Sequence, residues 1–194
     1  MGSTPFKKND TQLIAILDTI YNADQIDRVN MAGVQKQYGL QSTQVDSLWK
    51  KINVQDSINL IKVKKIISTH GWPGPDKVAE QGARTIFLVI QHADSLTQVT
   101  YLPLLREAVK KGKARPQDLA LLEDRILTKQ GKKQIYGSQL TQSGSERKSV
   151  FFPIEDEANV NKRRAAVGLE PIEDYAKRFG IIYVSPAAPA QEKK

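Results

Sequence analysis

The sequence predicts a mainly α-helical protein, a single-domain helical bundle with a small C-terminal β-hairpin. Apolar residues recur at helical spacing up to about residue 130. Short strand-like runs separated by turn residues occur only after it. The 194 residues suffice for one hydrophobic core, and no internal repeat or long linker divides them. We therefore expect one domain over residues 10–185.

The first helices are expected from apolar stripes and from end signals. One stripe predicts a helix over about residues 10–28, and a second short helix over 30–38 ends at Gly39. The members of this stripe are Leu13, Leu17, Ile20 and Tyr21. Ser42 or Thr43 can cap the next helix, and a further helix over about 56–69 ends before Gly71.

Three more helices are expected, over about residues 76–92, 95–111 and 116–130. In the second of them, Ser95 and Gln98 have the spacing of a capping box. Pro103 lies inside the same helix and should bend or break it, because proline donates no backbone hydrogen bond.

The chain changes character after residue 133. Strand-like runs at 134–136 and 149–152 flank the turn residues 143–145 and predict a hairpin at about 134–154. The elements expected beyond it are helices over 157–167 and 171–179 and a last strand over 181–184. Residues 1–9 are expected to be disordered or vector-derived, and 186–194 to form a disordered tail.

Composition and charge exclude several classes of protein. The absence of cysteine excludes disulfides, thiolate zinc sites and cysteine nucleophiles. The longest apolar run, residues 86–90, is far too short to span a membrane, so no membrane partner is expected. The net charge of +8 comes from residues 61–150, where the lysines precede glycines or turns without an aromatic platform. This pattern is typical of helix ends and argues against nucleic acid as a partner.

Known catalytic and cofactor motifs are missing from the sequence. It contains no G-x-S-x-G, no phosphate-binding P-loop and no G-x-G-x-x-G. No sequence motif therefore supports acyl transfer or nucleotide binding. The two histidines match no standard zinc spacing such as H-E-x-x-H. We therefore expect neither a cofactor nor a metal.

Polar residues on apolar helical faces are the strongest functional signal. Asp24 continues the stripe of the first helix, and Arg28 follows one turn later on the same face. This pair could orient a ligand or a catalytic group, or it could be a surface ion pair at a fraying helix end.

A second stripe is formed by Asn59, Val63, Ile66 and His70, so Asn59 and His70 bracket apolar residues on a face that should be buried. Trp72 follows in a rigid glycine- and proline-containing turn and could line a pocket.

His92 closes a helix beside Gln91 and Asp94. If the helix ends near residue 92, Asp94 can reach the imidazole and orient it as a general acid or base. The alternative is that both histidines are hydrogen-bonded structural residues of the core.

Several motifs of the chain resemble an uncharacterised bacterial family of unknown function, found in Bacteroidetes and actinobacteria. The motifs cover about residues 12–179 and are Asp24-Gln25 with Arg28, Asn59, His70-Gly71-Trp72-Pro73-Gly74, Gln91-His92-Ala93-Asp94, Glu123-Asp124-Arg125, Gln134-Ile135-Tyr136-Gly137-Ser138-Gln139, Pro153-Ile154-Glu155-Asp156, Arg163-Arg164 and Gly168-Leu169. Ser138 departs from the threonine of many relatives but keeps the hydroxyl. The resemblance brings no established activity. It adds Gln25, Gln91, Asp124, Arg125, Tyr136 and Gln139 to the candidate ligand-binding residues.

The resemblance also bears on location and oligomeric state. Relatives in the Bacteroidetes often look exported, and Met1-Gly2-Ser3 is typical of an engineered start. These two observations favour a periplasmic or secreted protein after leader removal over a cytoplasmic one. The oligomeric state stays open.

Three functions are consistent with these residues. The first is acid–base chemistry on a small or anionic ligand, with His92, Asp94 and His70 as the catalytic group and with Arg28 or Arg125 holding an anion. The second is a non-catalytic module that binds a small molecule, peptide or glycan in the same cleft. The third is a structural or interaction protein whose ion pairs at Asp24 and Asp124 only tie elements together. We favour a pocket over a purely structural role, and catalysis slightly over binding.

Overall fold

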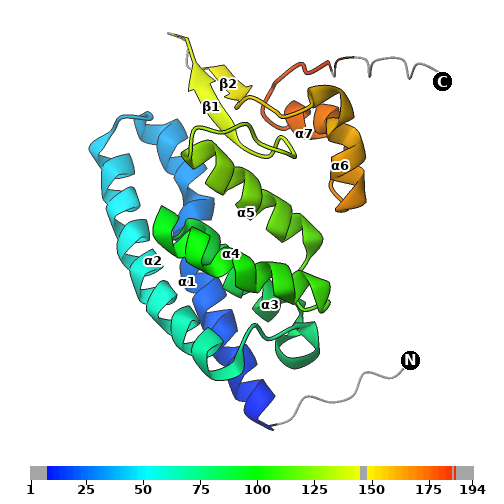
Figure 1. Ribbon diagram of the computed structural model, residues 1–194. Coiled ribbons are helices and arrows are strands. Elements are labelled where there is room, and N and C mark those ends of the chain that lie inside the picture. Colours follow the sequence, from blue (N-terminus) through cyan, green and yellow to red (C-terminus); the bar gives the residue numbers. More distant parts are fainter. Residues whose placement is uncertain (1–7, 145–147, 185, 187–194) are drawn as a thin grey trace, which may run out of the picture. The chain divides into compact units, whose positions relative to one another are not determined.

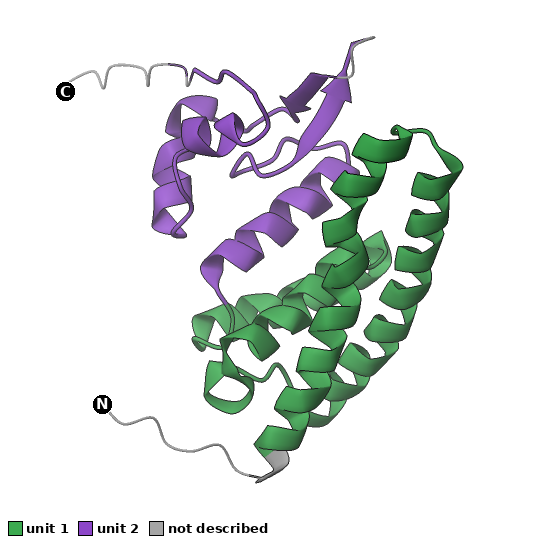
Figure 2. Cartoon of the chain, turned by 180° about the vertical axis from the view of Figure 1, so that it is seen from behind, with its two compact units in different colours: residues 1–114 green, residues 115–194 purple. Residues whose placement is uncertain are grey.

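The computed structural model describes residues 8–144, 148–184 and 186, and within them the chain is mainly α-helical, as predicted (Figure 1). The chain divides into two compact units, residues 1–114 and residues 115–194, which Figure 2 shows in different colours. The expectation of one domain over 10–185 stays a prediction. Residues 1–7 and 187–194, predicted to be disordered ends, and residue 145 of the predicted turn lie outside the described residues.

The first unit contains four helices: α1 (Lys8–Tyr38), α2 (Thr43–His70), α3 (Pro75–His92) and α4 (Ser95–Lys110). Both α1 and α2 are single long helices where the sequence predicts breaks. The reason is a buried cluster of Met31, Val45 and Ile52, against which Val34 and Leu48 pack. This contact between the end of α1 and the start of α2 stabilises both helices across the predicted breaks, because tertiary packing of an apolar face outweighs local propensity.

The helix ends of this unit are set by capping residues. Ser42 caps α2, since its hydroxyl accepts the N–H of Val45 at 3.3 Å. The cap of α4 is Asp94, whose Oδ1 accepts the N–H of Thr97 at 2.8 Å, so the capping box predicted from Ser95 and Gln98 is wrong. Of the bend or break predicted at Pro103, the break is wrong, because α4 continues through this residue to Lys110.

The core of the first unit lies along α3, where α1 packs against α2 and α3. The apolar run 86–90 is buried near the C-terminal end of α3. Leu17 and Ile20 of α1 and Val63 of α2 are buried as the stripes predict. Among the described residues, no helix has both the length and the apolar character that crossing a membrane requires.

The second unit contains α5 (Pro116–Lys129), a hairpin of β1 (Leu140–Ser143) and β2 (Lys148–Phe151), a 3₁₀ turn (Glu157–Asn159), α6 (Val160–Ala166) and α7 (Ile172–Lys177). The strands are antiparallel and Leu140 pairs with Phe151, which confirms the predicted hairpin. Its first strand begins later than predicted, since Gln134 forms only an isolated bridge with Ile154. The strand predicted at 181–184 is wrong, because this segment is irregular.

Candidate functional site

Four polar side chains from three helices of the first unit meet in one cluster. We call Asp24 and Arg28 of α1, Asp56 of α2 and His92 of α3 the Asp24 cluster. Nδ1 of His92 lies 3.1 Å from Oδ1 of Asp24, two groups 68 residues apart in sequence. Asp24 is only 3% exposed, so this pair lies inside the helical packing. The carboxylate on the imidazole is therefore Asp24 and not the predicted Asp94.

Arg28 joins the two carboxylates of the cluster. Its Nη2 donates to Oδ1 and Oδ2 of Asp56 at 2.5 and 2.6 Å. Its Nε lies 3.7 Å from Oδ2 of Asp24, one helical turn away. The predicted Asp24–Arg28 pair is thus part of a partly buried network rather than a surface pair at a fraying end, since α1 continues to Tyr38.

The environment of Asp24 favours its ionised form. Burial by itself would raise the pKa of this carboxyl group. The hydrogen bond and charge of His92, the hydrogen bond from Gln25 and the charge of Arg28 outweigh burial and hold the pKa below its ordinary value of 3.8. Asp24 is therefore a carboxylate at neutral pH.

The ionised carboxylate fixes the proton arrangement on His92. A carboxylate can only accept hydrogen bonds, so Nδ1 of His92 must carry the hydrogen that points at Asp24. In the neutral imidazole the lone pair is then on Nε2. No described residue is hydrogen-bonded to Nε2, and the side chain is 18% exposed. The side chain of His92 as a whole therefore keeps partial access to solvent.

Amide side chains surround the cluster. Gln25 donates from Nε2 to Oδ2 of Asp24 at 2.6 Å. Asn59, one turn after Asp56 on α2, is completely buried, and its Oδ1 accepts from Gln55 at 2.9 Å. Within the described part of the chain, Nδ2 of Asn59 has no hydrogen-bond partner. An unpaired buried donor costs stability.

The turn between α3 and α4 positions His92. Gln98 is completely buried and donates from Nε2 to the carbonyl oxygens of Gln91 and Ala93, at 2.7 and 3.0 Å. Asp94 is exposed, and bonds from the backbone and hydroxyl of Thr97 lower its pKa. Asp94 and Gln98 therefore shape the turn that carries His92. The side chain of Gln91 forms no hydrogen bond with any of the described residues.

His70 lies apart from the cluster, and the prediction that it is buried is wrong. It is exposed and lines a groove with Leu13. Leu13 lies eleven residues before Asp24 in α1, which is about 16 Å along a helix axis. Trp72 is buried at 3% exposure, so it packs in the core of the unit. The structure therefore brings only His92 of the two histidines to Asp24.

The predicted residues of the second unit hold a loop together. Asp124 is completely buried and accepts backbone N–H bonds from Ile135, Tyr136 and Ser138, at 2.7 to 3.2 Å. Its partners form the segment that leads into the hairpin, next to Gln139, whose Nε2 donates to the hydroxyl of Ser138 at 3.0 Å. This arrangement agrees with the structural role that was one of the three alternatives for Asp124.

Arg164 completes this loop from α6. It is 1% exposed, and its guanidinium donates to the carbonyl oxygens of Tyr136 and Glu170 at 2.7 and 2.6 Å. The same guanidinium lies 5.0 Å from the ring centre of Tyr175. Arg125, adjacent to Asp124, is half-buried in α5. Asp124, Tyr136 and Arg164 thus form one buried network inside the second unit.

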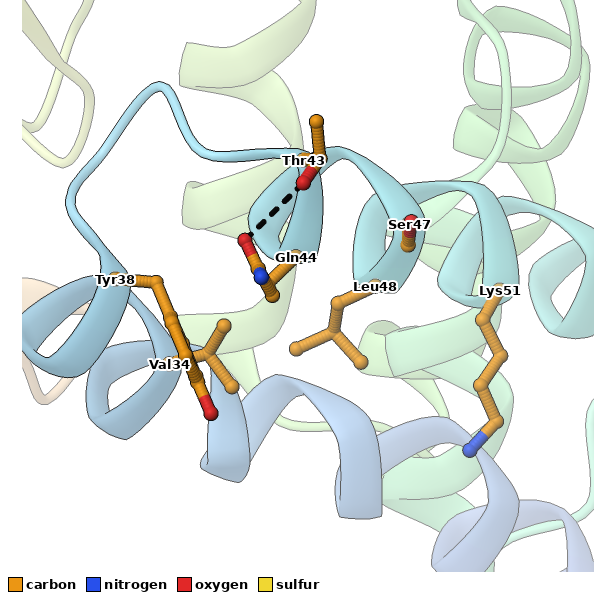
Figure 3. A pocket seen from close by; sticks show the side chains of 7 residues that line it. All are labelled: Val34, Tyr38, Thr43, Gln44, Ser47, Leu48 and Lys51. Atoms are coloured by element: carbon orange, nitrogen blue, oxygen red, sulfur yellow. Dashed lines mark hydrogen bonds between the residues drawn. The ribbon is translucent and has the colours of Figure 1, made fainter.

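Another groove of the first unit contains none of the predicted site residues. It measures about 560 Å³ and is lined by Val34, Tyr38, Thr43, Gln44, Ser47, Leu48 and Lys51 (Figure 3). Lys51 extends toward α1, where its Nζ pairs with Asp27 at 3.0 Å. Its charge is therefore already compensated, and the groove offers no acid–base pair.

A smaller hollow lies on the exposed side of α1, and no residue of the Asp24 cluster lines it. It measures about 360 Å³ and is lined along one face of α1 by Asn22, Gln25, Ile26, Val29 and Asn30. Gln25 links it to the cluster through the bond to Asp24. This volume falls in the lower part of the range of roughly 300–1,000 Å³ that is usual for small-ligand sites.

The Asp24 cluster also has the residue types of a metal site. One atom each of Asp24, Asp56 and His92 lie within 4.8 Å of one another. However, both oxygens of Asp56 already accept from Arg28, and a cation would have to displace this guanidinium. A metal ion at this site would therefore compete with Arg28 for Asp56.

Sequence reasoning missed Asp56, the partner of Arg28. The sequence could have indicated Asp56 as a site residue, because it lies three residues before Asn59 and therefore on the same side of α2. The pairing of Asp24 with His92 had no local signal, because the two residues lie on different helices.

Comparison with known proteins identifies one family. The model of the family described as "Family of unknown function (DUF6624)" matches residues 12–184. No curated protein and no solved structure matches the chain.

Proposed function

The chain belongs to the family of unknown function DUF6624, and we propose that its first unit carries out acid–base chemistry on a small ligand, with His92 as the proton carrier. The single observation that carries this proposal is the 3.1 Å contact between Nδ1 of His92 and the buried carboxylate of Asp24. Such a contact orients an imidazole, fixes its tautomer and stabilises its protonated form. Asp24 replaces Asp94 as the orienting residue in this proposal.

The roles of the four residues follow from their contacts. Nε2 of His92 takes a proton from the ligand, or from a water beside it, and returns a proton later in the reaction. Asp24 stabilises the imidazolium that forms in between. The charge of Arg28 adds to the effects of His92 and Gln25 that hold the pKa of Asp24 low, and Asp56 keeps Arg28 in place through its two bonds.

The ligand is proposed to be small and to carry an oxyanion or a polarised oxygen. Nη1 of Arg28 is bonded to no described residue, whereas Nη2 is held by Asp56. This free edge of the guanidinium can donate to an oxygen of the ligand.

Replacing His92 with glutamine is expected to lower kcat/KM by at least about 100-fold, because proton transfer by a positioned group typically contributes 10²–10⁴-fold. Gln preserves a polar side chain but cannot carry a proton at neutral pH. The assay incubates the protein with a panel of small esters, amides, phosphate esters and glycosides and follows the products by NMR.

His70→Gln is the matched control, since it removes the other histidine of the chain. It should leave the rate unchanged, because His70 is not part of the Asp24 cluster. Equal loss in both variants, or full activity of His92→Gln, would show that His92 is not the proton carrier.

A further inference from the structure

We propose that the groove beside His70 binds a free single-chain carboxylate, such as a medium-chain fatty acid. This groove lies between α1 and α2 and is separate from the Asp24 cluster. Its lining residues are Leu13, Ile16, Lys62, Lys65, Ile66, Thr69 and His70. The chemistry of this lining, which the proposed acid–base function does not use, carries the inference.

The floor of the groove is apolar. Leu13 and Ile16 lie one turn apart on α1, and Ile66 faces them from α2. Leu13 and Ile66 are buried, whereas Ile16 is 42% exposed although it is a large apolar side chain. The cavity of about 310 Å³ is at the lower limit for small-ligand sites, which suits one acyl chain.

The rim of the groove is basic and carries no acidic residue. Lys62, Lys65 and His70 follow one face of α2 at spacings of three and five residues. No carboxylate among the described residues pairs with Lys62 or Lys65, whereas Lys51 on the same helix is paired with Asp27. The hydroxyl of Thr69 already donates to the carbonyl of Lys65 at 2.9 Å. An apolar floor under uncompensated ammonium groups is complementary to an aliphatic chain with an anionic head.

The same charges argue against other occupants. A second copy of this chain would bring lysine against lysine across the contact, which costs energy. A neutral apolar ligand would leave the ammonium groups without a partner. A carboxylate head satisfies Lys62 and Lys65 while the lysine stems cover the aliphatic chain.

The test is an NMR titration of the full chain with decanoate, at concentrations where decanoate is monomeric. The ring signals of His70 should move and saturate, while those of His92 stay in place as an internal reference. Lys62→Glu/Lys65→Glu should weaken binding about tenfold or more, because two attractive charges become repulsive. Ile16→Ser should also weaken it, at a site where folding is little affected because the side chain is partly exposed.

Lys50→Glu/Lys64→Glu is the matched control, because both lysines are exposed on α2 and neither lines the groove. This variant has the same net charge as the first and should bind within about twofold of the unchanged protein. The proposal is overturned if the control loses as much affinity, if decanol binds as tightly as decanoate, or if His70 shows no saturable shift. The activity assay on His92 is independent of each of these outcomes.

Discussion

Asp124→Ala is expected to lower the free energy of unfolding by about 4 kcal/mol, the largest effect of any single change we consider. The carboxylate of Asp124 is completely buried and accepts N–H bonds from Ile135, Tyr136 and Ser138. Removing it leaves three backbone donors without their acceptor, and each such donor costs about 1–3 kcal/mol when it stays buried. The loop that leads into the hairpin would then lose its fixed conformation.

Urea unfolding followed by circular dichroism measures this effect. Asp124→Asn should cost less than alanine, because one of its two oxygens is retained as an acceptor. The control is Asp174→Ala in α7, which removes an exposed carboxylate paired with Lys177 and should change stability little. Similar losses at Asp124 and Asp174 would mean that the loop does not depend on the buried carboxylate.

Asp24→Ala is expected to lower the free energy of unfolding by about 3 kcal/mol. The change removes the acceptor of His92 and Gln25 and leaves the guanidinium of Arg28 with Asp56 alone. Breaking a buried charged network by removing one member is costly, because the remaining groups keep their desolvation penalty. The effect is smaller than at Asp124 because Arg28 and His92 retain partial access to solvent.

The same substitution should also change how stability depends on pH. The pKa of Asp24 is lower in the folded protein than its ordinary value of 3.8. The carboxylate therefore contributes its stability above pH 3.8, and this contribution is lost as the pH falls through the lower pKa of the folded state. The difference between the unchanged protein and Asp24→Ala should shrink accordingly in acid.

Urea unfolding at neutral pH and at several pH values below 3.8 measures both effects. Asp18→Ala is the matched control on α1, because Asp18 accepts a single exposed bond from Gln81. It should change stability little at any of these pH values. A difference at Asp24 that stays constant into acid would contradict the low pKa of its carboxyl group.

The helical class and most helix starts could be predicted from the sequence, because apolar spacing and capping residues are local signals. Gly39, Gly71 and the proline at position 116 lie where the sequence places the ends of helices. The continuity of α1 and α2 could not be predicted locally, because it depends on Met31 packing against Val45 and Ile52. The local sequence predicts a break in the helix near residue 29, and the packing between two helices outweighs this local preference.

The individual residues of the candidate site were predicted from the sequence, but which of them contact each other was not. Asp24, Arg28 and Asn59 were found from their positions on apolar faces, and His92 from its position at the end of an apolar helix. The assignment of Asp94 to His92 relied on proximity in sequence, and in the structure Asp94 is used to cap α4. Its place is taken by Asp24, which only the packing of α1 against α3 brings to the imidazole.

The central claim is that Asp24 holds His92 with its hydrogen on Nδ1 and its lone pair on Nε2. The most direct test is ¹⁵N NMR of the two imidazole rings at a pH where both are neutral, in the unchanged protein and in Asp24→Leu. The account predicts that His92 is mainly the Nδ1–H tautomer and that it loses this preference in the variant, while His70 is unaffected. If His92 is mainly the Nε2–H tautomer, or if Asp24→Leu leaves its tautomer unchanged, the proposed acid–base pair is contradicted.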